Sequence, residues 1–256
     1  ERNPQDIPHA AEGVDIVLEC SGKFNDRDKA AMHLEAGAKR VLVSAPCKNA
    51  DATIVYGVNH QQITANMKVI SNASCTTNCL APVAKVMADS VGIEAGYMTT
   101  IHAYTGDQPT LDSSHKDLRR ARAAALSMIP TSTVAARSVG DVLPELKGKM
   151  NGSAIRVPTA NVSAVDFGFT AERDTSTEEI NALLSAAAQG PMRDVLSVNS
   201  LPLVSIDFNH DPHSSIADLT QTHVMNKRLV RLLAWYDNEW GFSCRMLDNA
   251  AEIGKT

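Results

Sequence analysis

Residues 71–79, SNASCTTNC, place two cysteines among hydroxyl and amide side chains, a setting in which a thiol can react. Cys75 and Cys79 are separated by three residues, and no second Cys or His pair lies at ligand spacing, so we expect no metal site. A disulfide between them is not expected either, because side chains four residues apart on a helix are poorly aimed for its torsion angle. The remaining interpretation is a reactive thiol.

The segment KVIS before this stretch has the pattern of a strand, and CLAPVAKVMADSVG has that of a helix. Cys75 is therefore expected at a helix N-terminus, where unpaired N–H groups and the helix dipole favour a thiolate. Lowering a thiol pKa from ~8.5 to ~6 raises its ionised fraction at neutral pH about 30-fold. His102, near the end of the expected strand 96–105, is a candidate base. The alternative is that both are structural residues, which is the commoner case for a lone cysteine or histidine.

The first third of the chain has the pattern of a parallel α/β sheet. An apolar run at 13–20, a helix candidate at 26–40 and a strand at 41–46 form a β-α-β unit. Gly37 is expected to end that helix. Further strands are expected at 53–59 and 68–74.

Beyond residue 95 the sequence favours an antiparallel sheet. In the segment 161–170, Val165, Phe167 and Phe169 occupy one face, which is the period of a half-buried strand. A helix is expected from Ser176, with Glu179 as its capping-box partner, to Gly190. Other strands are expected at 96–105, 201–208 and 228–236.

We therefore predict the α/β class, with a partial Rossmann-type parallel sheet followed by an α+β catalytic domain whose sheet is mostly antiparallel. The first domain is expected to span 1–74, with a C-terminal helix at 241–256 packing back on it, and the catalytic domain 75–240.

Composition limits the functional classes. The formal net charge of -5 and the pI near 5.9 argue against nucleic-acid binding and against attraction to anionic lipid. An odd number of cysteines, 5, fits a reducing compartment. No apolar run is long enough to span a membrane, so we expect a soluble, cytoplasmic protein.

The motifs resemble those of the phosphorylating glyceraldehyde-3-phosphate dehydrogenase family. The resemblance covers nearly the whole chain, in family order, through ECSGKF, SAPCKN, SNASCTTNC, TTIHAYTGDQ, LPELKGKMNG, RVPTANVSAVD and WYDNEWGFS. It implies oxidation of D-glyceraldehyde 3-phosphate to 1,3-bisphosphoglycerate, with Cys75 as nucleophile and His102 as general base. It also implies a thioester released by inorganic phosphate, NAD as cofactor with NADP as a second candidate, and a homotetramer.

The same resemblance assigns binding residues. Those of the substrate-phosphate site are Thr105, Asp107 and Arg156. Those of the inorganic-phosphate site are Ser74, Thr76, Thr133 and one arginine of the Arg119–Arg120 pair, for which we choose Arg120. Those expected to contact the nicotinamide half of the cofactor are Ser21, Gly22, Ser44, Asn238, Glu239 and Phe242. Without the resemblance, DLRRAR would be interpreted as a solvated charged face and WYDNEW as core.

Three departures from the family pattern affect these expectations. No G-x-G-x-x-G is present, so we expect an N-terminally truncated chain that lacks much of the adenosine site. Val134 stands where the family has glycine, which puts phosphate affinity in doubt because a β-branched residue resists positive φ. Ser113 and Ser114 replace a Leu-Pro pair, a change found in members that accept NADP.

Two alternatives remain open at this point. The segment DFNHDPHSS at 207–215 resembles relatives that oxidise erythrose 4-phosphate. A catalytically impaired fragment with a redox-thiol or RNA-binding role is the second alternative.

Overall fold

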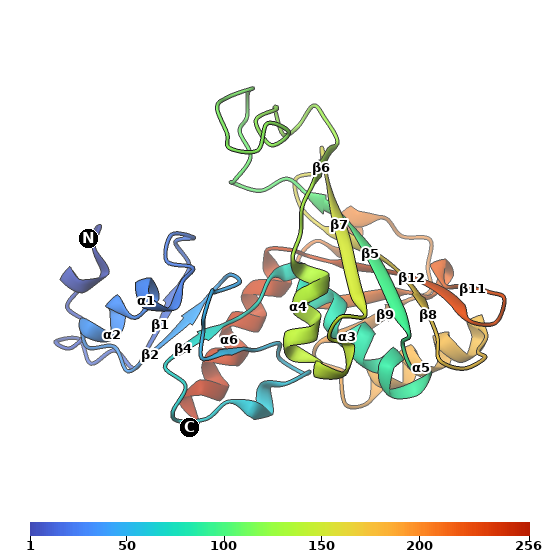
Figure 1. The fold of residues 1–256 in the computed structure, drawn as a ribbon, viewed down its shortest axis with the longest axis horizontal. Helices are drawn as coiled ribbons and strands as arrows, with labels where there is room; N and C mark the ends of the chain where they lie inside the picture. Colours follow the sequence, from blue (N-terminus) through green and yellow to red (C-terminus); the bar gives the residue numbers. More distant parts are fainter. The chain divides into compact units, whose positions relative to one another are not determined.

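The computed structural model describes residues 1–256, which divide into two compact units. One contains Glu1–Ser74 and Ser243–Thr256, and the other contains Cys75–Phe242. Figure 1 labels their helices and strands.

The first unit is built on four parallel strands in the order β1-β2-β4-β3. Their bounds are β1 (Ile16–Glu19), β2 (Arg40–Val43), β3 (Ala52–Thr53) and β4 (Val69–Ser71). The side chains of Val41, Leu42 and Ile70 are fully buried. The two central strands are therefore covered on both faces, as expected of a parallel sheet.

The predicted helix at 26–40 is two short helices, α1 (Arg27–Ala30) and α2 (Met32–Glu35). The Asp26 carboxylate caps the first by accepting from the N–H of Asp28 at 3.1 Å. Gly37 follows the second with φ of 104°, and a Cβ there would lie 2.5 Å from the Cβ of Ala10. Glycine is thus required at this position, as the sequence predicted.

The strand predicted at 53–59 is wrong beyond Thr53, where β3 ends. The Asn59 side chain closes the segment into a loop, because its Oδ1 accepts from the N–H of Val55 at 2.8 Å and its Nδ2 donates to the carbonyl of Thr53 at 2.9 Å. Ile54 and Val55 are nevertheless fully buried. Their apolar character reflects burial in a loop rather than a strand.

The C-terminal residues of the chain pack within the same unit. Helix α6 spans Trp240–Gly254, and the Nη1 of Arg40 in β2 donates to the carbonyl of Ile253 and to the hydroxyl of Thr256, both at 2.7 Å. The Asn249 amide donates to the Oδ1 of Asn72 at 2.6 Å. Short 3-10 turns occupy η1 (Pro4–Asp6) and η2 (His60–Gln62).

The second unit contains an eight-stranded sheet in the order β6-β7-β5-β8-β12-β10-β9, with β11 paired to β12. Its strands are β5 (Ala95–Ala103), β6 (Ile129–Thr131), β7 (Met150–Val157), β8 (Ser163–Thr170), β9 (Leu196–Asn199), β10 (Ser215–Asp218), β11 (His223–Met225) and β12 (Leu229–Tyr236). Only the β5–β7 and β9–β10 pairs are parallel. The predicted class, a parallel sheet followed by a mostly antiparallel one, is confirmed.

Three helices pack against this sheet (Figure 1). Helix α3 (Cys75–Ser90) contacts β8, β10 and β12, α4 (Ala135–Val142) contacts β7, and α5 (Thr177–Gln189) contacts β9. Helix α5 begins where predicted, with the Ser176 hydroxyl accepting from the N–H of Glu179. Short 3-10 turns lie at η3 (Pro144–Leu146) and η5 (Leu219–Gln221).

The strand predicted at 201–208 is wrong. Pro202 cannot donate to a ladder, and the Asp207 carboxylate accepts from the N–H of Val204 at 2.9 Å, which turns the chain into the 3-10 helix η4 (Ser205–Phe208). Within the segment only Phe208 is fully buried.

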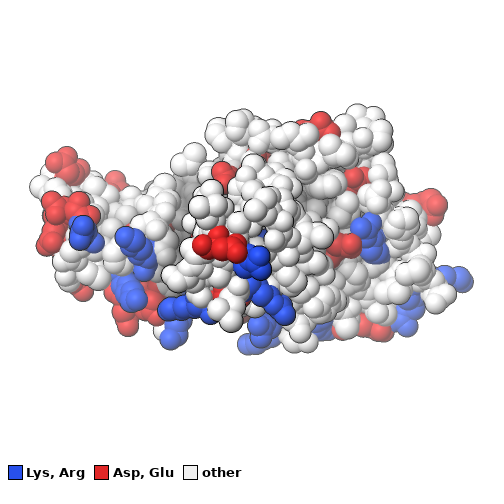
Figure 2. All heavy atoms as spheres, turned by 90° about the horizontal axis from the view of Figure 1, so that it is seen from above, with Lys and Arg blue, Asp and Glu red and all other residues white.

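The surface carries charges of both signs. On the face drawn in Figure 2, lysine and arginine side chains are interspersed with aspartate and glutamate. None of the helices combines the length and the apolar character that a membrane span requires.

Candidate active site

Cys75 and His102 face each other in the second unit. Cys75 is the first residue of α3 and His102 lies in β5, one residue before its end. The Cys75 Sγ is 3.4 Å from the His102 Nε2. The Nδ1–H of the same ring donates to the carbonyl of Ala103 at 2.7 Å, which leaves Nε2 as the acceptor for the thiol proton.

Burial decides the charge states of this pair. Burial raises the pKa of the Cys75 thiol above its ordinary value, although the Arg156 charge and hydrogen bonds from Thr76 act in the opposite direction. Burial, and then the Arg156 charge, lower the pKa of His102 to about 4. Burial thus acts against the predicted thiolate, whereas the Arg156 charge and the hydrogen bonds from Thr76 favour it. In the ligand-free chain, burial therefore favours a neutral thiol facing a neutral imidazole.

The low pKa of His102 makes the stability of the protein depend on pH. An unfolded histidine takes up its proton near pH ~6.5, whereas the folded one does so only near pH 4. The neutral His102 ring thus makes its full contribution to the free energy of unfolding above the pKa of the unfolded histidine. As the pH falls toward the pKa of the folded histidine, this contribution is lost, by about 3 kcal/mol in total. Between pH 7 and pH 5, His102 should lower the free energy of unfolding of the wild type by about 2 kcal/mol, and His102→Gln should abolish this decrease. Urea unfolding at the two pH values measures it. The same change at the exposed His223 should leave the loss intact, and equal pH dependence in all three proteins would contradict the assignment.

Tyr236 connects the two elements that carry this pair, and the sequence did not reveal it. Its hydroxyl lies 2.9 Å from the hydroxyls of both Thr76 in α3 and Thr100 in β5. Its side chain is 1% exposed, and its ring meets that of His102 edge-on, with centroids 5.9 Å apart. Burial raises the pKa of this phenol, so it stays protonated and bridges the helix to the strand. The only signal in the sequence was its place at the end of the alternating segment 228–236.

Arg156 is a partly buried cation without a carboxylate partner. Its Nη1 lies 2.9 Å from the His102 Nδ1, and it donates to the carbonyl of Ala103 at 3.0 Å and to the hydroxyl of Thr105 at 3.4 Å. Burial lowers its pKa. A guanidinium held this way beside a thiol favours the binding of an anion.

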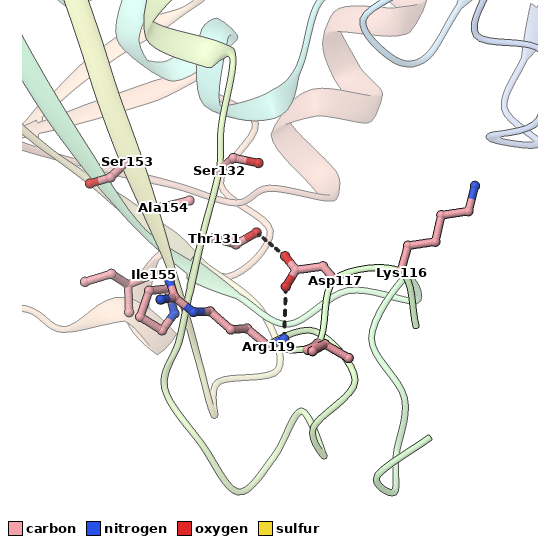
Figure 3. Close-up of a pocket in the computed structure, with 10 residues that line it drawn as sticks. Lys116, Asp117, Arg119, Thr131, Ser132, Ser153, Ala154 and Ile155 are labelled. Carbon is pink, nitrogen blue, oxygen red and sulfur yellow. Dashed lines mark hydrogen bonds between the residues drawn. The ribbon is translucent and has the colours of Figure 1, made fainter. Parts of the chain in front are cut away.

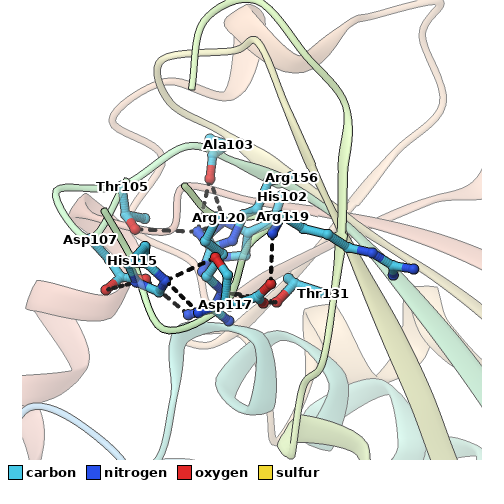
Figure 4. Close-up of polar contacts among 10 residues, drawn as sticks. All are labelled: His102, Ala103, Thr105, Asp107, His115, Asp117, Arg119, Arg120, Thr131 and Arg156. Atoms are coloured by element: carbon cyan, nitrogen blue, oxygen red, sulfur yellow. Dashed lines mark hydrogen bonds and ion pairs between the residues drawn. The ribbon is translucent and has the colours of Figure 1, made fainter. Parts of the chain in front are cut away.

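The long segment between β5 and β6 extends beyond the sheet (Figure 1) and contributes charged side chains around Arg156 (Figure 4). In this segment, the Arg120 Nη1 pairs with the Asp107 carboxylate at 2.9 Å, while its Nε donates to the hydroxyl of Thr131 at 2.9 Å. Arg120 therefore contacts Asp107 and Thr131. It makes no hydrogen bond to Thr133, which was expected in the same inorganic-phosphate site and whose hydroxyl contacts Ala135.

Thr133 and Val134 directly precede helix α4. The Thr133 hydroxyl accepts from the N–H of Ala135 at 3.1 Å. Val134 has φ of −96° and is 51% exposed. The predicted conflict with a positive φ at Val134 is therefore wrong, since its backbone is one that any residue adopts. Ser74 is half-buried and directly precedes α3, and the Thr76 hydroxyl faces Tyr236.

The end of β12 holds the expected nicotinamide contacts of the second unit. Asp237 accepts from the N–H groups of Glu239 and Trp240 at 3.0 and 2.8 Å, which fixes the start of α6. Asn238 is 7% exposed, and its Oδ1 accepts from the Ser163 hydroxyl at 2.7 Å. Glu239 is exposed and Phe242 is half-buried.

The expected cofactor contacts of the first unit follow β1 and β2. The Glu19 carboxylate accepts from the backbone N–H of Ser21 at 2.8 Å and from its hydroxyl, and it also contacts the His33 ring at 2.9 Å. Gly22 has φ of 72°, with no atom within 4 Å of an added Cβ. The N–H of Ser44 donates to the carbonyl of Glu19 at 3.0 Å. Strand ends and open backbone of this kind are where α/β sheets bind nucleotides.

A separate cavity of about 780 Å³ lies beside strands β6 and β7 (Figure 3). Its polar edge is fixed by Asp117, whose carboxylate accepts from the N–H of Arg119 at 2.9 Å and from the hydroxyl of Thr131 at 3.4 Å. Of the residues named for the reaction, only Arg119, the arginine of the pair that we did not choose, lines this cavity.

Comparison with known proteins agrees with these motifs. Residues 74–238 match the family described as glyceraldehyde 3-phosphate dehydrogenase, C-terminal domain. The chain is 65% identical, over 254 residues, to the glyceraldehyde-3-phosphate dehydrogenases of Cereibacter sphaeroides and Xanthobacter flavus, covering 99% of this chain and 76% of each relative. It is 58% identical to that of Zymomonas mobilis, of which it covers 77%. The chain belongs to the glyceraldehyde-3-phosphate dehydrogenase family.

Proposed function

We propose that this chain oxidises D-glyceraldehyde 3-phosphate to 1,3-bisphosphoglycerate through a thioester on Cys75, with inorganic phosphate as the second substrate. The observation that carries the proposal is the Cys75–His102 pair, 3.4 Å apart, beside a partly buried Arg156 that has no carboxylate partner. The relatives that share this sequence are named for the same aldehyde.

The first half of the reaction follows from the neutral pair. As Sγ bonds to the aldehyde carbon, the thiol proton passes to the His102 Nε2, which returns it to the new oxyanion and so forms a hemithioacetal. Nε2 then takes the hydroxyl proton while the hydride leaves the same carbon, which produces the thioester. The low pKa of His102 keeps its ring neutral, and only a neutral ring can accept these protons.

The second half releases the product. An oxygen of inorganic phosphate attacks the thioester carbon, the carbon–sulfur bond breaks, and the protonated Nε2 returns its proton to the Cys75 sulfur. Thr76, Thr133, Ser74 and Arg120 are proposed to bind this phosphate. The Thr76 and Thr133 hydroxyls are held by Tyr236 and by the N–H of Ala135 in the ligand-free chain, so each must share its hydrogen bonds with the anion.

NAD is the proposed cofactor, and NADP is a second candidate because of Ser113 and Ser114. When bound, the nicotinamide accepts the hydride. Asn238 fits this group, since its Oδ1 is engaged by the Ser163 hydroxyl while its Nδ2 has no hydrogen-bond partner within the protein and stays accessible. Glu239 and Phe242, and in the first unit Ser21, Gly22 and Ser44, are proposed as further contacts.

A homotetramer is the proposed assembly. Tyr97 and Ile101 of β5 expose apolar side chains, 53% and 39% respectively, on one face of the large sheet. Leu118, Leu126 and Met128 in the long segment are at least 73% exposed. Apolar surface of this extent usually marks a contact between proteins.

The proposal is tested by following NADH formation with D-glyceraldehyde 3-phosphate, which should require inorganic phosphate. Because Arg156 is proposed to bind the substrate phosphate, Arg156→Gln is expected to lower kcat/KM for this aldehyde about 10- to 100-fold. Activity with unphosphorylated D-glyceraldehyde should change far less. Arg137→Gln, which removes an exposed arginine of α4, is the matched control.

An equal loss with both aldehydes would reject Arg156 as the phosphate ligand. NADH formation that proceeds at full rate without inorganic phosphate would reject the phosphorylating reaction.

A further inference from the structure

Ser163, the first residue of β8, links the two halves of the proposed active site. Its side chain is 1% exposed. The backbone N–H of Ala103 donates to its Oγ at 3.0 Å, and its Oγ lies 2.7 Å from the Asn238 side chain. Ala103 is also the residue whose carbonyl accepts from the ring of His102.

The two hydrogen bonds of Ser163 run in opposite directions. A backbone N–H can only donate, so the Ser163 oxygen must act as an acceptor toward Ala103. The single hydroxyl proton of Ser163 is then available for Asn238, and the amide atom that lies 2.7 Å away to accept it is Oδ1.

The consequence concerns the other end of the Asn238 amide. With Oδ1 held by Ser163, the Nδ2 group is the other end of the amide and has no hydrogen-bond partner within the protein, while some of its surface stays accessible. An accessible amide N–H that no protein group uses is available to donate to an acceptor on a ligand.

We infer that Ser163 is a positioning residue that fixes Asn238 as a hydrogen-bond donor toward the carbonyl oxygen of the nicotinamide substituent. The inference rests on the proposed function and adds a specificity determinant to it. Without the hydroxyl, the Asn238 amide can rotate and present either its oxygen or its nitrogen. After rotation, the Asn238 oxygen can accept a hydrogen bond from the NH2 group of a carboxamide. A ring substituent that lacks N–H makes no such hydrogen bond.

Two cofactors that differ only in this group provide the test. NAD carries a carboxamide, whereas its 3-acetylpyridine analogue keeps the carbonyl and has a methyl group in place of NH2. Ser163→Ala is expected to weaken binding of the acetylpyridine analogue about three- to tenfold more than binding of NAD, with dissociation constants measured by calorimetry. Ser163→Thr, which keeps the hydroxyl, should restore the wild-type ratio. Ser215→Ala, which removes a fully buried hydroxyl facing Cys79, should leave the ratio unchanged.

A second variant covers the case in which Ser163→Ala does not fold. Asn238→Asp keeps the acceptor for Ser163 and replaces the amide donor by a second carboxylate oxygen, so it should weaken the acetylpyridine analogue more than NAD, whose NH2 group can still donate to that oxygen. An unchanged ratio in a folded Ser163→Ala protein overturns the inference and leaves the proposed function standing, as does a loss confined to NAD in Asn238→Asp. A wild-type chain that binds neither cofactor overturns the proposed cofactor and the inference together.

Discussion

Replacing Cys75 by alanine is expected to lower kcat/KM for the phosphorylating oxidation by at least about 10⁴-fold. The sulfur forms the covalent bond on which both halves of the proposed reaction depend, and no other side chain within reach of His102 can replace it. NADH formation measures the loss. Mass spectrometry of the protein mixed with aldehyde and NAD, without phosphate, should detect an acyl adduct on the wild type and none on the variant.

Cys79→Ala is the matched control for this change. Cys79 lies one turn deeper in α3, is fully buried with its sulfur 3.5 Å from the Ser215 hydroxyl, and has its pKa raised by burial to about 12. Its removal should affect stability rather than chemistry. A Cys75→Ala protein that keeps more than about a tenth of the wild-type activity would rule out the thioester route.

Replacing His102 by asparagine is expected to lower kcat by about 10²- to 10⁴-fold, the usual range for loss of a general acid–base. The effect should fall on kcat more than on KM, because the ring acts on protons that move during reaction. Stopped-flow mixing with aldehyde and excess NAD measures thioester formation alone and should show the same loss.

Thiol alkylation by iodoacetamide provides an independent measurement. In the wild type, Nε2 accepts the thiol proton at 3.4 Å, so Cys75 should react several-fold faster at neutral pH than in the His102→Asn variant. Equal alkylation rates in the two folded proteins would mean that the imidazole does not assist the thiol.

The parts of the fold that the sequence predicted are those with strong local patterns. The alternation of Val165, Phe167 and Phe169 corresponds to β8, and the Ser176 capping box starts α5. Strand β7 was missed because Asn151, Gly152 and Ser153 have low strand propensity, and its pairing with β5 comes from tertiary contacts.

The wrong strands share one physical cause. At 53–59 and 201–208, side chains of Asn59 and Asp207 bond to nearby backbone and turn the chain, which a count of apolar residues does not detect. The fold class was predictable because it depends on the repeated patterns and not on these segments.

The candidate site was predictable in its residues and not in its electrostatics. The sequence predicted Cys75 at a helix N-terminus and His102 near the end of a strand, and the structure has both residues at these positions. The neutral state of the pair depends on burial and on the charge of Arg156, which is 81 positions from Cys75 along the chain. The bridging role of Tyr236 likewise arises only when α3, β5 and β12 come together.

The unpaired charge of Arg156 has a consequence for when the enzyme is reactive. In the ligand-free chain this charge contributes to keeping His102 a weak base. A dianionic substrate neutralises that field on arrival, so the imidazole gains proton affinity only while the aldehyde is in place. The resting thiol is thereby kept latent, and its exposure to adventitious electrophiles and oxidants is limited to the lifetime of the productive complex.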